Sequence, residues 1–173
     1  IVFLIVLIVG TSYRSQRLLT FFNINEGKGE ESYHIWQVIL ALGSGGLLGH
    51  GLGMSRFKYG YIPEAVGDSI FAIIGEELGF AGAVALILAY LWLVIRIFRI
   101  ARQSENLFYS YIAVGVGCWI GAQAFINISA MVVLIPLTGI TLPLISYGGT
   151  SLLSTLIAFG WVLQISKYTS KSK

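Results

Sequence analysis

Residues 61–79 read Tyr-Ile-Pro-Glu-Ala-Val-Gly-Asp-Ser-Ile-Phe-Ala-Ile-Ile-Gly-Glu-Glu-Leu-Gly, and this stretch, which holds four of the eight acidic residues, runs directly into a long apolar segment. Proline is tolerated in the first turn of a helix, so Pro63 predicts a helix that begins just after it. On that helix Glu64 and Asp68 share a face, because they lie four residues apart. The same stripe continues through small residues that would let another helix approach closely, namely Ala72, Gly75, Gly79, Gly82 and Ala83.

Two interpretations of Glu64 and Asp68 are open. Acids in the first turn of a helix are stabilised by the helix macrodipole by about 0.3–1 kcal/mol, which is a purely structural role. Acids beside a stripe of small residues at the rim of a membrane helix bundle instead face protein or a polar cavity, which favours a functional role.

The composition indicates a membrane protein. The 173 residues are 56% hydrophobic and 11% charged, whereas soluble domains carry about 25% charged residues. The net charge of +3 lies mostly in two clusters beside apolar segments, so it predicts membrane topology and no nucleic-acid partner. Cys118 is the single cysteine, which excludes an intrachain disulfide.

The apolar segments predict an all-α integral membrane protein, a fragment of a polytopic helical bundle with about four membrane segments. Residues 1–10 are too short for a complete span and are expected to be the end of a first helix, so that the chain begins inside it. Complete spans are predicted over residues 70–98, 107–135 and 144–165.

Cationic residues set the expected orientation. Arg96, Arg99 and Arg102 end the second span, and Lys167, Lys171 and Lys173 follow the fourth. Because such clusters mark the cytoplasmic side, residues 99–106 should be a cytoplasmic loop and residues 166–173 a cytoplasmic tail. Residues 11–69, a large loop with short interfacial helices, and residues 136–143, a short turn, should then be extracytoplasmic.

The large loop contains three further features. Ile35–Leu42 is an apolar run too short to span, which fits an interfacial or re-entrant helix. The glycine-rich segment that follows, residues 43–53, lacks the Gly-Lys-Ser/Thr ending of a nucleotide loop and is read as a flexible turn. Arg56 and Lys58 could contact a lipid-linked diphosphate beside mobile glycine amides, or could only attract lipid headgroups.

His34 and His50, the two histidines, lie sixteen residues apart with no cysteine near, so no zinc site is expected and both are read as surface or satisfied loop side chains. No metal site is predicted anywhere in the chain.

Polar residues inside the later spans are predicted to be structural. Gln123 and Asn127 share one face of the third span, where each would bridge to a neighbouring helix for about 0.6 kcal/mol. Ser146 and Tyr147 open the fourth span with hydroxyl side chains, which suits tight packing or the mouth of a polar cavity.

Several long motifs, in order, resemble the SEDS family (shape, elongation, division and sporulation; FtsW, RodA and SpoVE). The residues that carry the resemblance are those of 61–79, Gly43-Ser44-Gly45-Gly46, Gln123–Ile128 and Leu142–Gly149. The likeness is greatest to the FtsW branch and covers the C-terminal part of such proteins. The family usually has His-Thr before the aspartate and Phe after it, whereas this chain has Val66, Gly67 and Ser69.

The resemblance implies a peptidoglycan glycosyltransferase of the bacterial cytoplasmic (inner) membrane. Such an enzyme polymerises lipid II into glycan strands at the outer face, during cell division or elongation, beside membrane lipid and a class B penicillin-binding protein as transpeptidase partner. A carboxylate there can accept the proton of the attacking sugar hydroxyl. Asp68 is the candidate base, Glu64 its neighbour, and Arg56 and Lys58 the diphosphate contacts. No cofactor is certain; holding a divalent cation on the diphosphate is the other role open to Asp68.

Two other classes of function stay open from the sequence. A flippase for the lipid-linked precursor would line a path at the bilayer midplane with polar residues, whereas here the acids gather at one surface and no charged residue lies between Asn106 and Ser166. A non-catalytic membrane scaffold for a transpeptidase is the third possibility.

Overall fold

The computed structural model describes residues 30–55 and 67–171. The predicted first membrane segment, together with Glu64, Arg56 and Lys58, lies outside these residues. Within them the chain forms four helices and no strand: α3 (Glu30–Ser44), α4 (Ile70–Gln103), α5 (Leu107–Met131) and α6 (Gly149–Lys171). The prediction of an all-α protein is confirmed.

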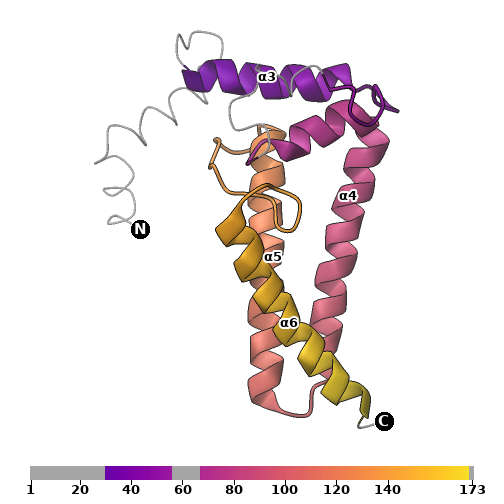
Figure 1. Cartoon of the computed structure of the whole chain (residues 1–173), viewed down its shortest axis with the longest axis vertical. Helices are drawn as coiled ribbons and strands as arrows, with labels where there is room; N and C mark the ends of the chain where they lie inside the picture. The colour runs from indigo at the N-terminus through magenta and orange to yellow at the C-terminus, as the bar shows by residue number, and fades with distance from the viewer. Residues whose placement is uncertain (1–29, 56–66, 172–173) are drawn as a thin grey trace, which may run out of the picture.

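Three of the helices are long and apolar enough to cross a membrane: Ile70–Gln103, Leu107–Met131 and Gly149–Tyr168. Figure 1 shows α4, α5 and α6 forming a bundle, with α3 lying across one end of it. We call this the α3 end. Large apolar side chains on the bundle are exposed, as lipid-facing residues would be, including Leu88, Trp92, Phe125, Leu153 and Trp161.

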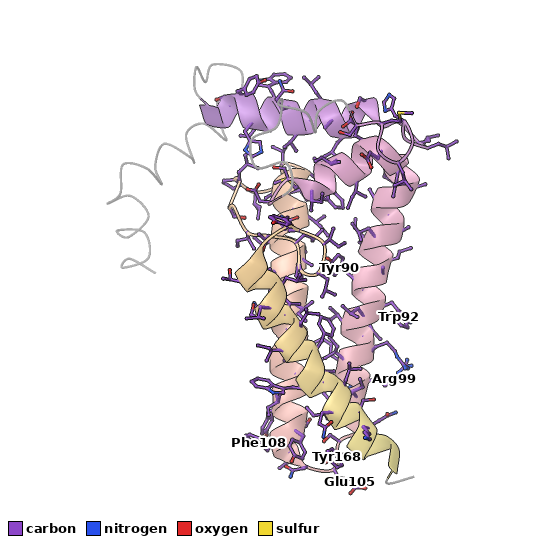
Figure 2. The ribbon with its side chains drawn as sticks, in the orientation of Figure 1. Tyr90, Trp92, Arg99, Glu105, Phe108 and Tyr168 are labelled. Atoms are coloured by element: carbon purple, nitrogen blue, oxygen red, sulfur yellow. The ribbon has the colours of Figure 1, made fainter. Side chains whose placement is uncertain are left out.

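The cationic residues at the ends of α4 and α6 lie at the opposite end of the bundle. The last turns of α4, which carry Arg99 and Arg102, and the end of α6, which carries Lys167, are both at the lower end of Figure 1. In Figure 2, Glu105 and Phe108 mark the connection from α4 to α5 at this same end. The two clusters used to predict the orientation therefore share one end, which we call the cationic end.

Helix α4 is broken at Gly79. This residue has φ 68° and ψ −168°, so residues 70–78 form a short helix and residues 80–103 a long one. Such a backbone conformation is essentially restricted to glycine. Figure 1 shows the short part turned across the end of the bundle beneath α3. The sequence predicted one uninterrupted helix here, because an apolar run does not reveal a break of this kind.

The glycine-rich segment fills the break in α4. In an unbroken helix, Glu76 O would accept from Phe80 N, and Glu77 O from Ala81 N. All four groups bond to the segment instead, through His50 N to Glu76 O (3.1 Å), Gly51 N to Glu77 O (2.9 Å), Phe80 N to Gly46 O (2.9 Å) and Ala81 N to Leu47 O (3.2 Å). The approach requires glycine, because a Cβ on Gly49 would lie 2.1 Å from Glu77 O. The segment is therefore a packed clasp around α4, and its interpretation as a flexible turn is wrong.

The connection between α5 and α6 is longer than the turn predicted over residues 136–143. Helix α5 ends at Met131 instead of Ile135, and α6 begins at Gly149 instead of Leu144, so residues 132–148 are non-helical. Val133 (φ 59°) and Leu144 (φ 67°) adopt left-handed conformations that interrupt both helices. Leu142 and Pro143 are buried. Because buried residues in an irregular segment are apolar too, the sequence predicted membrane spans that extend into this connection from both sides.

The core beneath α3 joins these parts. Val38 of α3, Phe71 and Tyr90 of α4, Met131 of α5 and Leu142 of the connection belong to one buried cluster. A second cluster, with Ile97, Ile120 and Val162, packs α4, α5 and α6 together nearer the cationic end. The α3 end is thus a layered structure in which α3, the start of α4 and the α5–α6 connection hold one another in place.

Candidate functional site

Asp68 lies in a turn that precedes α4 and does not belong to the helix. Residues 67–69 are a turn, Ser69 is the residue before the helix, and the first turn of α4 contains no acid. Ala72 N bonds to Ser69 O (3.0 Å), while Asp68 O accepts from the side chain of Asn127. The prediction of a helix that begins just after Pro63 is therefore wrong for Asp68, and so is its place in the stripe of small residues.

Gly75 of the predicted stripe lets α3 approach closely, whereas Gly79 breaks the helix and Gly82 meets only Leu78 of α4 itself. Ala72 and Gly75 are buried in the short part of α4. A Cβ on Gly75 would lie 2.4 Å from Cδ2 of Leu42 on α3. This close packing brings α3 over the turn that holds Asp68.

Three parts of the chain surround the half-buried carboxyl group of Asp68. Its Oδ1 accepts from Ser69 Oγ at 3.2 Å. Its Oδ2 faces the α5–α6 connection, where a Cβ on Gly139 would lie 3.9 Å away. On the other side, Ser69 Oγ is 2.8 Å from Nε2 of His34 on α3.

Asn127 of α5 fixes the backbone of this turn. Its Nδ2 donates to Asp68 O (2.7 Å) and to Ile140 O in the α5–α6 connection (2.6 Å). One turn earlier, Gln123 Nε2 donates to Thr141 O (2.9 Å). The sequence predicted bonds to a neighbouring helix, but both amides bond to irregular backbone, because loop carbonyls lack the intrahelical partners that helix carbonyls have.

Asn127 also carries an unused acceptor inside the site. The residue is 1% exposed, and its Oδ1 has no hydrogen-bond partner within the part of the chain that the structure describes. Since buried polar atoms are seldom left unpaired, this acceptor is an exception within the core that surrounds the turn of Asp68.

Further bonds hold the α5–α6 connection in its irregular conformation. Ser146 Oγ accepts from Leu142 N at 2.7 Å, and Thr141 Oγ1 is 2.9 Å from Ser151 Oγ of α6. Tyr90, which points inward from α4 in Figure 2, donates to Pro143 O. Ser146 thus closes a turn before α6 and does not open that helix. Tyr147 is 82% exposed.

Glu76 is buried in the short part of α4 at 1% exposure. Its carboxylate accepts from Ser55 Oγ. This bond ties the residues after the glycine-rich segment to α4, so we read Glu76 as part of the clasp.

Three backbone amides of the clasp are not available to an anion, because Gly49 N, His50 N and Gly51 N donate to Gly45 O, Glu76 O and Glu77 O. The hypothesis that mobile glycine amides assist a diphosphate is therefore wrong for these three groups. Among residues 30–55 and 67–171, no three His, Cys, Asp or Glu side chains lie close enough to hold a metal ion.

The sequence model of the FtsW/RodA/SpoVE family, described as "Cell cycle protein", matches residues 1–171. The chain is 42% identical over 173 residues to the "Probable peptidoglycan glycosyltransferase FtsW" of Neisseria gonorrhoeae, covering 98% of this chain and 37% of that protein. It is 44% identical over 163 residues to "Stage V sporulation protein E" of Bacillus subtilis, covering 94% and 44%.

Solved structures show the same likeness. A chain of a peptidoglycan synthase complex, reported for its coordination of polymerization and crosslinking, aligns with a TM-score of 0.68 and 25% identity, over 92% of this chain and 43% of that one. An aspartate-to-alanine mutant of the rod shape determining protein RodA of Thermus thermophilus aligns with a TM-score of 0.57 and 34% identity, over 75% and 39%. The chain thus spans less than half the length of these relatives.

Proposed function

This chain belongs to the FtsW/RodA/SpoVE family, whose members are multi-pass bacterial membrane proteins, and from that premise we propose that the full protein is a peptidoglycan glycosyltransferase. Its substrate is lipid II, which it joins into glycan strands at the outer face of the cytoplasmic membrane. The relatives named glycosyltransferases support this activity.

The observation that carries the proposal is the environment of Asp68. A carboxylate lies at the end of the bundle opposite the cationic residues of α4 and α6, with its backbone held by Asn127 and one oxygen near Gly139 of the α5–α6 connection. Catalytic acids and bases need such fixed placement within reach of the reacting proton.

Asp68 serves as the general base of a single displacement. The attacking sugar hydroxyl loses its proton to Asp68 as its oxygen bonds to the anomeric carbon of the donor. The bond from that carbon to the diphosphate breaks, and undecaprenyl diphosphate leaves with the electron pair. The anomeric carbon is inverted, so the reaction needs no covalent enzyme intermediate.

The remaining parts of the proposed site lie outside the described residues. Arg56 and Lys58 contact the diphosphate of the donor, since cationic side chains bind phosphate oxygens through charge-assisted hydrogen bonds. Glu64 is the acidic neighbour of Asp68 in sequence. A class B penicillin-binding protein is the proposed partner, because the structural relative is a complex that both polymerises and crosslinks.

The test of this function is direct. Purified full-length protein, with its transpeptidase partner present, is expected to convert labelled lipid II into glycan chains of many disaccharide units, resolved by gel electrophoresis. A flippase would move labelled lipid II across vesicles without forming chains. A scaffold would give chains only when a second polymerase is added, and either result would overturn the proposal.

The orientation can be tested separately by cysteine labelling in a Cys118→Ser background, because Cys118 is exposed on α5. A membrane-impermeant maleimide applied to intact cells with a permeable outer layer is expected to label Thr138→Cys, in the exposed α5–α6 connection, and to spare Gln103→Cys at the cationic end. Labelling of Gln103→Cys alone would place Asp68 on the cytoplasmic side and exclude an outward-facing site.

A further inference from the structure

The side chain of Ser69 does not make the hydrogen bond that is usual for its position in the fold. It occupies the N-cap position of α4, where a serine side chain commonly accepts a bond from an amide of the first helical turn. Its side chain makes no such bond. The hydroxyl, on a residue with 0% exposure, lies instead between Asp68 Oδ1 (3.2 Å) and His34 Nε2 (2.8 Å).

The protons available on these groups determine which of the three side chains donates each hydrogen bond and which accepts it. A hydroxyl has one proton, and an ionised carboxylate can only accept, so we assign the Ser69 proton to Asp68 Oδ1. With this assignment the contact with His34 requires the tautomer that carries its proton on Nε2, which donates to Ser69 Oγ. The donors therefore run from His34 through Ser69 to one oxygen of the carboxylate, and Oδ2 stays directed at the α5–α6 connection.

The backbone and the carboxyl group of Asp68 are held by different parts of the chain. Asn127 of α5 bonds to the backbone oxygen, whereas Ser69 and His34 act on the side chain. His34 comes from α3, 35 residues away in sequence from Ser69. Loss of His34 or Ser69 should thus free the rotation of the carboxyl group while leaving Asp68 in place.

We propose that His34 and Ser69 are positioning residues for glycan polymerisation, which hold the carboxyl group of Asp68 so that Oδ2 meets the proton of the attacking sugar hydroxyl. The inference rests on the proposed function, because it assumes that Asp68 is the base. A general base must lie within hydrogen-bond reach of the proton it takes, and a carboxyl group free to rotate meets that condition for a smaller fraction of the time.

The positioning role depends on two groups, a hydroxyl and an imidazole, that different parts of this chain supply. Ser69 supplies the hydroxyl, and α3, packed at Leu42 over Gly75, supplies the imidazole within reach of it.

The test measures initial rates of lipid II polymerisation by the full-length protein with its partner, over a range of lipid II concentrations. Ser69→Ala and His34→Ala are each expected to lower kcat roughly tenfold, with KM unchanged. Because both act through one hydroxyl, the double variant should be no slower than the slower single variant. Ser69→Thr, which keeps the hydroxyl, should recover most of the rate, and Glu105→Gln, in the α4–α5 connection at the opposite end of the bundle, is the control.

Three results would overturn the inference: wild-type kcat for His34→Ala, a raised KM at unchanged kcat, or losses that add in the double variant. If Ser69→Ala fails to accumulate, His34→Ala decides alone, because His34 is only partly buried and does not belong to the buried core clusters. Inactivity of Asp68→Asn beside wild-type rates for the other variants rejects this inference and leaves the proposed function standing. An active Asp68→Asn rejects Asp68 as the base.

Discussion

Asp68→Asn in the full-length protein is expected to abolish glycan polymerisation while the protein accumulates in the membrane at its normal level. Loss of a general base typically costs about 10²–10⁴ in rate. The measurement is the rate of chain formation from labelled lipid II by purified protein, together with the amount of protein in the membrane fraction.

The contacts of Asp68 explain why Asp68→Asn should lose activity and still fold normally. Asparagine is nearly isosteric with aspartate, and its side-chain oxygen can still accept from Ser69 Oγ. The backbone oxygen that Asn127 holds is unchanged by the substitution. The alternative role, an acid in the first helical turn, does not apply to Asp68, which precedes the N-cap residue of α4. What the substitution removes is the basic carboxylate.

Glu105→Gln is the matched control. It makes the same change of carboxylate to amide in the exposed connection between α4 and α5, at the cationic end of the bundle (Figure 2). Its rate is expected to equal that of the wild type. Polymerisation by Asp68→Asn at the same rate as by Glu105→Gln would reject Asp68 as the base.

The membrane helices could be predicted from the sequence, because uninterrupted apolar runs are sufficient evidence for a span. The connection of residues 132–148 could not, since Leu142 and Pro143 are apolar for a different reason: they are buried in protein, with the nearby backbone bonded to Gln123, Asn127 and Tyr90. Hydropathy does not distinguish contact with lipid from contact with protein.

Asp68, Gln123 and Asn127 were singled out from the sequence as an acid and two amides in an apolar setting, and the structure brings them together around one connection. The bonding partners of Gln123 and Asn127 were not predictable, because these are backbone carbonyls of irregular segments. His34 was read as an ordinary loop histidine, since its contact with Ser69 depends on where α3 lies. The available signal was Ser69 itself, a hydroxyl where the family usually has phenylalanine.

Gly79→Ala is expected to destabilise the protein by about 3 kcal/mol or more. Forcing a residue with a Cβ into φ 68°, ψ −168° costs about 1–3 kcal/mol. The added Cβ would also lie 2.4 Å from Gly49 N and 2.7 Å from Leu47 O, so the clasp must move. Each of the four backbone hydrogen bonds that this displaces contributes about 0.5–1.5 kcal/mol.

The consequence for function follows from the same contacts, because the clasp holds α3 over the short part of α4 and so holds His34 at Ser69. Purified Gly79→Ala protein is expected to melt at a lower temperature than the wild type and to polymerise lipid II more slowly. Gly160→Ala is the control: Gly160 lies inside α6 with open space around the added Cβ, and alanine there should stabilise the helix by up to about 1 kcal/mol. Equal melting temperatures for the two variants would show that the break in α4 does not depend on glycine, and that the clasp is not what fixes α3 above the site.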